Sequence, residues 1–322
     1  MSRSLSVLIP ARHEMWLRRT VEDVLANARA DTEVIVVLDG EPADPPLPDD
    51  PRVRVLAYLT SIGQRAATNA AAAASTADYL MKLDGHCALD EGFDVKLIAA
   101  AQQLGDDLVQ IPAQWNLHVF DWVCACGKRQ YQGPTPTTCD CGEPRWAREV
   151  IWKPRQRRLT TAWFFDTEPK FGYWQAAQKR QREPICDVMT SLGACWFMSR
   201  ARFAALGGMD EAAGSWGSFG IEVACKAWLS GGRHVVNRDT WFAHMFRTQG
   251  GDFSFPYPIT GSQQERARQR ARDLWFGNTW PGQVRPLLWL LEHFAPVPVW
   301  HDPAGAAVLA QIEAAAADFA RR

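Results

Sequence analysis

Strand-like and helix-like segments alternate through the first hundred residues, and this alternation limits the fold more than any other feature. Apolar runs typical of buried strands cover residues 5–11, 32–40, 53–58 and 78–86, and segments with helical spacing or high alanine content cover 16–28 and 61–75. Parallel strands need long crossover connections, which are usually helices. The pattern therefore predicts an α/β fold with a mostly parallel sheet flanked by helices.

Polar side chains stand at the carboxyl ends of these predicted strands. Asp39 closes the second run, and the fourth runs into Asp84, Gly85 and His86. Parallel sheets bind ligands at this edge. Residues two apart on a strand share a face, so Asp84 and His86 can reach one metal ion or polar ligand. From these residues alone, a strand end followed by a polar turn is the alternative.

Composition excludes some classes of protein. The net charge of −1 names no class of partner, and no run of about 18 apolar residues exists, so we expect no membrane span and no membrane partner. The apolar stretch at the start is too short for a secretory signal. We expect a cytoplasmic protein.

Residues 121–185 differ in character from the chain around them. They carry 12 Lys plus Arg against 7 Asp plus Glu, many aromatics and four of the eight cysteines. We interpret them as an insert. Alternating α/β signals return after it, with helices expected at 220–232, 262–275 and 304–322 and a strand at 234–248.

The four cysteines of the insert form two close pairs. The pairs are Cys124 with Cys126 and Cys139 with Cys141, and a glycine follows each pair. Two such pairs suit the tetrahedral site of a structural Zn²⁺. Chance clustering and two disulfides are the alternatives, and a cytoplasmic location disfavours disulfides.

Five motifs in order resemble a known family. They are "HEMWLRRTV", "LDGHC", "WGSFGIEVACKAWLSGG", "WFAHMFR" and "RDLWF". The chain resembles the catalytic domain of polypeptide N-acetylgalactosaminyltransferases (glycosyltransferase family 27) over about residues 5–112 and 188–280, with a broader likeness to family 2. The resemblance implies a GT-A fold, a Rossmann-like α/β fold that binds a nucleotide sugar. It also implies a UDP-sugar donor and a divalent cation.

The resemblance also implies roles for individual residues. Asp84, His86 and His244 are the expected metal ligands, and two imidazoles suit Mn²⁺ better than Mg²⁺. The residues expected to bind the nucleotide sugar are Arg12, Glu14, Asp39, Arg65, Asp84, Trp216 and Arg247. Arg247 would add positive charge at the leaving diphosphate.

One motif departs from the family pattern. Where the family has Glu-Asn, this chain has Phe219-Gly220. Glu222 is the next acidic residue and matches a second family glutamate, so we include it among the catalytic candidates. An inverting transfer needs a base beside the acceptor hydroxyl, so the missing carboxylate favours retention. Asp210 or Glu211 is an alternative base.

The surroundings of the cysteines bear on the acceptor. Basic and aromatic residues interleave there, as on surfaces that contact nucleic acid, and Arg155, Arg157 and Arg158 are the candidate contacts. A solvated face on a folded insert is the alternative. We therefore expect a macromolecular acceptor, with a hydroxymethylated pyrimidine in viral, for example bacteriophage, DNA favoured. The alternatives are Ser or Thr in protein and a catalytically inactive nucleic-acid-binding module.

Two further expectations concern organisation. We divide the chain into a nucleotide-sugar-binding half (1–120), the insert (121–185), an acceptor and metal half (186–280) and a helical extension (281–322). The segment 250–258 contains Phe253, Phe255 and Tyr257, and we expect it to close over the donor.

Overall fold

The structure is a computed structural model that describes residues 4–247, 255, 257 and 261–321, except for the side chain of Arg158. The amino-terminal part contains β1 (Leu5–Ala11), α1 (Leu17–Asn27), β2 (Thr32–Asp39), β3 (Val53–Tyr58), α2 (Gln64–Ala74), β4 (Tyr79–Leu83), β5 (Cys87–Leu89) and α3 (Phe93–Leu104). The middle contains β6 (Leu108–Cys124), β7 (Arg129–Tyr131), β8 (Trp146–Thr160), β9 (Trp163–Phe165), β10 (Phe171–Tyr173), α4 (Gln175–Arg180) and β11 (Ile185–Asp187). The remainder contains β12 (Cys195–Ser199), α5 (Arg200–Ala205), α6 (Phe219–Leu229), β13 (Arg233–His244), α7 (Gly261–Ala271), a π-helical turn (Arg272–Phe276), α8 (Leu287–His293) and α9 (Ala306–Phe319).

A central mixed sheet organises the molecule. Its strand order is β11-β13-β6-β12-β4-β1-β2-β3. Strands β4, β1, β2 and β3 are parallel, whereas β12 runs antiparallel to β4 and to β6. The predicted α/β fold is confirmed, and the parallel part coincides with the alternating segments of the sequence.

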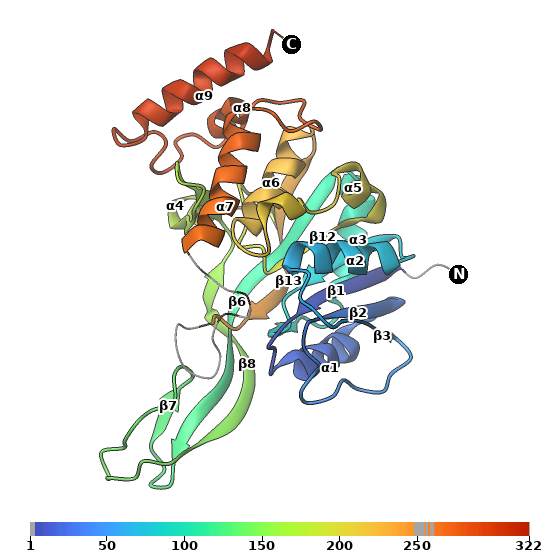
Figure 1. Cartoon of the computed structure of the whole chain (residues 1–322), viewed down its shortest axis with the longest axis vertical. Coiled ribbons are helices and arrows are strands. Elements are labelled where there is room, and N and C mark those ends of the chain that lie inside the picture. The colour runs from blue at the N-terminus through green and yellow to red at the C-terminus, as the bar shows by residue number, and fades with distance from the viewer. Residues whose placement is uncertain (1–3, 248–254, 256, 258–260, 322) are drawn as a thin grey trace.

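Helices cover both faces of the parallel part. Helix α1 lies on one face and α2 on the other (Figure 1), so strands such as β2 are buried on both sides. The residues from Val34 to Val37 are fully buried. This explains why the strand is continuously apolar instead of alternating.

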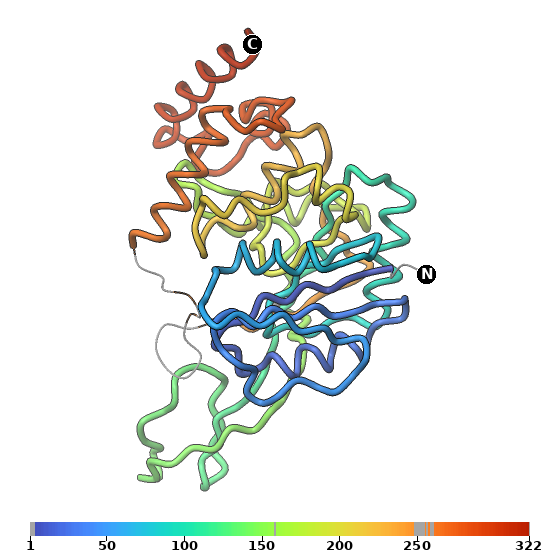
Figure 2. Tube along the Cα trace, turned by 45° about the vertical axis from the view of Figure 1, so that its right-hand side comes forward, coloured from blue at the N-terminus to red at the C-terminus, as the bar shows by residue number. Residues whose placement is uncertain are grey.

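Strands β6 and β8 form an arm that extends beyond the sheet (Figures 1 and 2). Strand β6 begins in the core between β13 and β12, continues for 17 residues, and pairs in the arm with β7 on one side and β8 on the other. The arm is thus a continuation of the central sheet. Residues after β8 return to the core, where Trp163, Phe165 and Trp174 are buried. The insert therefore supplies both an arm and core structure, and its limits at 121–185 stay a prediction.

The carboxyl-terminal helices pack at the opposite end from the arm (Figure 2). A second apolar cluster joins α6 to α8 through Trp228 and Leu291, and Trp300 lies in the same cluster. Nε1 of Trp300 donates a hydrogen bond of 2.7 Å to the carbonyl oxygen of Phe165. The segment 281–322 is thereby tied to the core by apolar and polar contacts.

Candidate active site

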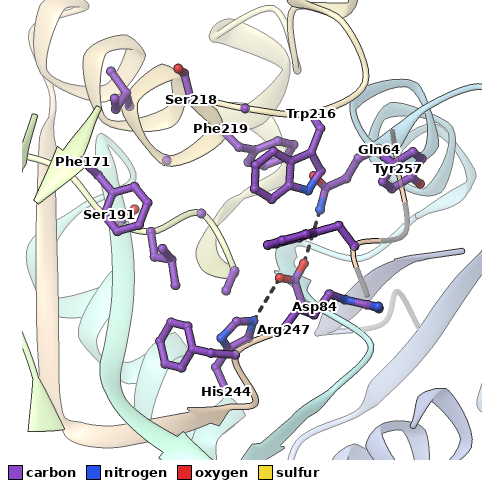
Figure 3. Close-up of a pocket in the computed structure, with 18 of the residues that line it drawn as sticks. Gln64, Asp84, Phe171, Ser191, Trp216, Ser218, Phe219, His244, Arg247 and Tyr257 are labelled. Carbon is purple, nitrogen blue, oxygen red and sulfur yellow. Dashed lines mark hydrogen bonds and ion pairs between the residues drawn. The ribbon is translucent and has the colours of Figure 1, made fainter. Parts of the chain in front are cut away.

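A cavity of about 450 Å³ opens at the carboxyl ends of β1, β4 and β13 (Figure 3). Its size is within the range of small-molecule sites. The described residues that line it and bear a polar or aromatic side chain include Arg12, Glu14, Gln64, Asp84, His86, Lys170, Phe171, Tyr173, Ser191, Trp216, Ser218, Phe219, His244, Phe246, Arg247, Phe255, Tyr257, Gln264 and Arg268.

Asp84 follows the last residue of β4, and its carboxylate is held from several sides. The buried ammonium of Lys82 pairs with Oδ1, and Gln64 at the start of α2 donates to the same oxygen at 3.3 Å. Burial raises the pKa of Asp84, but the charge of Lys82 and the contacts with His86 and His244 hold it well below its usual range. The carboxylate is therefore ionised at neutral pH, as a divalent cation requires.

His86 lies between β4 and β5 and is oriented by Glu14. Its Nδ1 lies 2.7 Å from Oε2 of Glu14, whose carboxylate also pairs with the guanidinium of Arg247. Burial raises the pKa of Glu14, but the charges of His86 and Arg247 outweigh this effect and lower it. Because Glu14 contacts Nδ1, Nε2 is the nitrogen of His86 that would coordinate a metal.

His244 is the last residue of β13, and its ring is buried. Nε2 lies 3.3 Å from Oδ2 of Asp84, yet neither ring nitrogen makes a hydrogen bond of good geometry within the described part of the chain. Burial lowers the pKa of His244 to about 4, so the ring is neutral and can coordinate a metal near pH 7. Buried polar groups usually have hydrogen-bond partners, so a buried neutral imidazole without one suits a metal ligand.

The three predicted metal ligands come together. One ligand atom from each of Asp84, His86 and His244 lies within 4.8 Å of the others. A carboxylate with two imidazoles suits a divalent transition metal. The donor set and the buried His244 ring, whose Nε2 lies 3.3 Å from Oδ2 of Asp84, both fit a metal at this site.

Five of the seven predicted nucleotide contacts line the cavity, and the other two, Asp39 and Arg65, do not belong to its described lining. Arg12, Glu14, Trp216 and Arg247 line the cavity together with Asp84. Phe255, within the segment expected to close over the donor, packs edge-on against Trp216 with ring centroids 5.7 Å apart. Phe253 lies outside the described residues.

The role expected for Asp39 in binding the nucleotide sugar stays a prediction. Asp39 is fully buried and is absent from the described lining of the cavity. Its carboxylate accepts hydrogen bonds from the backbone amides of Ile62 and Gly63 and from the hydroxyl groups of Ser61 and Tyr257, at 2.6 to 3.0 Å. Asp39 thus holds the loop before α2 against Tyr257, and Tyr257 lines the cavity.

Arg65 and Glu222 are also placed away from the cavity lining. Nε of Arg65 lies 2.7 Å from Oε2 of Glu222, and both side chains are buried. Lys226 pairs with the other carboxylate oxygen at 2.9 Å. The two side chains thus belong to a buried ion-pair network that joins α2 to α6, and the roles expected for them in donor binding and catalysis stay predictions.

The acceptor side of the cavity has no unpaired carboxylate among the described residues. The lining carboxylates are those of Glu14 and Asp84, and both are paired as described above. Asp210 pairs with Arg270 at 2.7 Å, and Glu211 accepts a hydrogen bond from Asn69, so neither alternative base faces the cavity. At Gly220 a Cβ atom would meet the carbonyl oxygen of Ser191 at 2.0 Å, which explains the glycine there.

The four insert cysteines cluster at the tip of the arm. Sγ of Cys124 and Cys141 are 3.6 Å apart, as are those of Cys126 and Cys139, and all four lie within 4.8 Å of one another. All four are free thiols. Sulfurs about 2.3 Å from a tetrahedral Zn²⁺ would lie roughly 3.8 Å apart, so the arrangement fits zinc and not disulfides.

Backbone turns at the cysteines support this fit. The amide of Gly127 donates to the carbonyl oxygen of Cys124, and the amide of Gly142 donates to that of Cys139, both at 2.8 Å. Gly127 and Gly142 have positive φ angles of 87° and 86°. The two turns are thus alike, and each needs the glycine that follows its cysteine pair.

Sequence reasoning missed Lys82, although it lies two residues before Asp84. It is a lysine within an apolar strand, which is unusual because a buried ammonium needs a partner. A lysine within an apolar strand could have indicated a buried partner of opposite charge, which the structure shows to be Asp84.

Comparisons with known proteins agree with this geometry. Residues 6–116 match Glycosyl transferase family 2. The fold is similar to that of a crystal structure of GalNAc-T7 with UDP, GalNAc and Mn²⁺, with a TM-score of 0.60, 17% identity and coverage of 86% of this chain and 50% of that chain. The fold is therefore of the GT-A type, and residues 6–116 resemble Glycosyl transferase family 2.

Curated relatives make the resemblance more particular. The chain is 25% identical to probable N-acetylgalactosaminyltransferase 9 of Caenorhabditis elegans over 81% of its length, covering 42% of that protein. It is 24% identical to polypeptide N-acetylgalactosaminyltransferase 3 of Homo sapiens over 83% of its length, covering 40% of that protein. The chain thus spans less than half the length of these relatives, which are N-acetylgalactosaminyltransferases by name.

In the part of the chain that the structure describes, no helix is both long and apolar enough to cross a bilayer. The cytoplasmic location stays a prediction.

Proposed function

We propose that this chain is a metal-dependent glycosyltransferase that moves a sugar from a UDP-sugar to the hydroxyl group of Ser or Thr in a polypeptide. The observation that carries the proposal is the group of Asp84, His86 and His244 at the cavity, whose ligand atoms lie within 4.8 Å of one another. Metal-binding side chains at this edge of the sheet suit the binding of a diphosphate.

Each group at the cavity has a task in this proposal. Asp84, His86 and His244 would hold Mn²⁺ or Mg²⁺, which would supply positive charge for the leaving diphosphate. Arg247 adds a second positive charge from its place beside Glu14. Trp216 offers an aromatic surface at the same cavity. Arg12 lies at the carboxyl end of β1, where we place the nucleotide.

The absence of a free carboxylate among the described lining residues favours retention of the sugar's anomeric configuration. An inverting displacement needs a positioned base to take the acceptor proton. In a same-face mechanism an oxygen of the departing diphosphate takes that proton as the C1–O bond to the diphosphate breaks. NMR of the first-formed product would show the donor's anomeric configuration.

The name of the Homo sapiens relative supports a polypeptide acceptor over the DNA base that composition favours. The arm also gives less support to a nucleic-acid surface than its composition implies. Three of its cations are paired with carboxylates of the arm itself, in the pairs Lys128–Asp140, Arg129–Glu149 and Arg145–Glu143. Arg155 and Arg157 remain exposed, and the side chain of Arg158 lies outside the described residues.

The cysteine cluster completes the proposal. We place one structural Zn²⁺ among Cys124, Cys126, Cys139 and Cys141, where it would hold the tip of the arm together. The four thiols would fill its tetrahedral shell, which leaves no position for a substrate.

The decisive experiment compares acceptors and metals directly. The protein is stripped with EDTA, Mn²⁺ is restored, and UDP-GalNAc, UDP-GlcNAc, UDP-galactose and UDP-glucose are offered with Ser/Thr peptides or with hydroxymethylated DNA. Mass spectrometry should show Mn²⁺-dependent sugar addition to peptide. His244→Ala should lose at least about a hundredfold in rate, whereas the control His301→Gln should not. Transfer to DNA alone would replace the proposed acceptor, and full turnover without metal would overturn the metal role.

A further inference from the structure

Strands β13, β6 and β8 lie side by side and connect the metal site to the arm. In the register of the sheet, His244 of β13 lies opposite Asn116 of β6, and Asn116 lies opposite Arg155 of β8. Residues directly opposite on neighbouring strands project from the same face. Arg155 therefore emerges on the face of the sheet that bears His244.

The distance between Arg155 and His244 is short, because neighbouring strands lie about 4.8 Å apart. Two such steps place the backbone of Arg155 about 10 Å from that of His244. Lys153 lies opposite His118, two residues further along the same face, so the row runs from the site into the arm. Arg157 lies within the bulge between Thr160 and Arg155 and is exposed.

These cations differ from the other basic residues of the arm. Lys153, Arg155 and Arg157 are exposed and form no ion pair with a carboxylate of the described residues, in contrast to Lys128, Arg129 and Arg145. The guanidinium of Arg155 lies over the ring of Tyr131, 4.7 Å from its centroid, and that ring packs against His118. Arg155 is thus held in place while its charge stays unneutralised.

We infer that Lys153, Arg155 and Arg157 form an acceptor track that binds acidic side chains of the polypeptide to be glycosylated. This inference rests on the proposed function, because it names the class of acceptor for that same site. The acidic residues would lie on one side of the modified hydroxyl, since the track leaves the cavity in one direction.

A polypeptide fits this track better than a nucleic acid does. Within the described part of the sheet, β8 pairs with β6 alone, so its other edge can accept an extended chain. In the remainder of the arm, Glu149, Glu143 and Asp140 pair with three of the cations, which leaves fewer positive charges for a continuous phosphate backbone. A few free cations match a few carboxylates, whereas duplex binding commonly uses about 6–10 phosphate contacts.

The geometry also fixes where the acidic residue should stand. An extended peptide advances about 3.3 Å per residue, so a span of about 10 Å corresponds to about three residues. We expect the strongest preference for Asp or Glu about three positions from the modified Ser or Thr, and a weaker one further along the same side.

The experiment uses the full chain, Mn²⁺ and a panel of fluorescent peptides with one Thr and a single Glu moved from five residues before it to five residues after it. Each peptide has a Gln counterpart. Anisotropy measures peptide affinity without turnover, mass spectrometry measures sugar transfer, and UDP-sugar hydrolysis reports whether the donor site is intact.

The test variants are Arg155→Gln and the double variant Lys153→Gln/Arg155→Gln. Arg145→Gln is the control, because Arg145 is equally cationic but pairs with Glu143.

The inference predicts two- to fivefold tighter binding for the best Glu peptide than for its Gln counterpart, as expected for an exposed charge contact. That difference in affinity should disappear in the double variant, persist in Arg145→Gln and shrink with salt, while UDP-sugar hydrolysis is unchanged.

Transfer without any Glu preference would overturn the track and leave the proposed function standing. No sugar transfer to peptide and no UDP-sugar hydrolysis would reject the proposed function itself. Binding of hydroxymethylated DNA that is weakened by the double variant, without a Glu preference, would replace the polypeptide as occupant.

Discussion

Oε2 of Glu14 lies 2.7 Å from Nδ1 of His86, and both side chains are almost fully buried. A histidine that binds a metal through one nitrogen usually donates the proton of its other nitrogen to a carboxylate or carbonyl oxygen. Glu14 therefore fixes the tautomer and the orientation of His86, and its contact with Arg247 links the metal site to the charge proposed for the diphosphate.

This relationship predicts a graded effect on metal binding. Glu14→Ala should weaken Mn²⁺ binding about 10- to 100-fold, whereas Glu14→Gln, which keeps a hydrogen-bond acceptor, should recover part of that loss. Calorimetric titration with Mn²⁺ in the absence of substrate measures it. Glu22→Ala is the control, because Glu22 pairs with Arg18 on the exposed side of α1. Unchanged Mn²⁺ affinity in Glu14→Ala would show that Glu14 does not position His86.

A second prediction concerns the buried pair of Arg65 and Glu222. Glu222→Gln removes the carboxylate that Arg65 and Lys226 share and leaves their buried charges uncompensated, so it should cost about 3–5 kcal/mol of unfolding free energy. Urea denaturation measures this cost. The exposed Arg18–Glu22 pair is the control, and Glu22→Gln should cost less than about 1 kcal/mol. A Glu222→Gln protein of normal stability that cannot transfer sugar would contradict this structural role and support the catalytic role expected from sequence.

A third prediction concerns pH. His234 on β13 is fully buried, neither ring nitrogen has a hydrogen-bond partner among the described residues, and burial lowers its pKa to about 3. In the unfolded chain its pKa returns to about 6.5, so below that pH the unfolded state binds a proton that the folded state does not. Folding stability should therefore fall as pH falls from about 6.5 toward 3.

The matched variant for this effect is His234→Leu, which removes the titrating group and its unpaired nitrogens. Urea unfolding between pH 7 and pH 4 should show a shallower loss of stability for this variant than for the wild type. His13→Gln is the control, because its side chain is 53% exposed. Equal pH dependence in the wild type and His234→Leu would contradict the assignment.

The parallel half of the sheet could be predicted from sequence because β1 and β2 are buried on both faces and form continuous apolar runs, although β3 at the sheet edge is largely exposed. Residues 5–11 and 53–58 were predicted with the boundaries that the structure gives to β1 and β3. The arm could not be predicted in this way. Strand β8 is rich in Arg and partly exposed, so it carries no continuous apolar run, and its pairing with β6 depends on contacts distant in sequence.

The same distinction applies to the site. Asp84, His86 and His244 were predicted by motif and are brought together, because each stands at the end of a short or buried strand whose register is fixed. The contact between Arg65 and Glu222 could not be predicted, because a charged residue near a strand end or helix start has the same local pattern whether it faces a ligand or another side chain. Their pairing joins positions 157 residues apart, and sequence spacing holds no information about it.

The zinc cluster leads to the last prediction. Because a structural zinc contributes directly to folding of the segment that binds it, Cys126→Ser should lose the metal and loosen the tip of the arm while the central sheet stays folded. Elemental analysis of freshly purified wild type should give one zinc per chain, retained when Mn²⁺ is removed by brief treatment with EDTA. Hydrogen exchange should speed up in residues 121–150 of the variant and stay slow in β1 and β2.

Cys186→Ser is the control, because Cys186 is outside the cluster and its thiol contacts the carbonyl oxygen of Glu183. Zinc-free wild type with normal exchange protection at the tip would show that the thiols hold the arm without a metal.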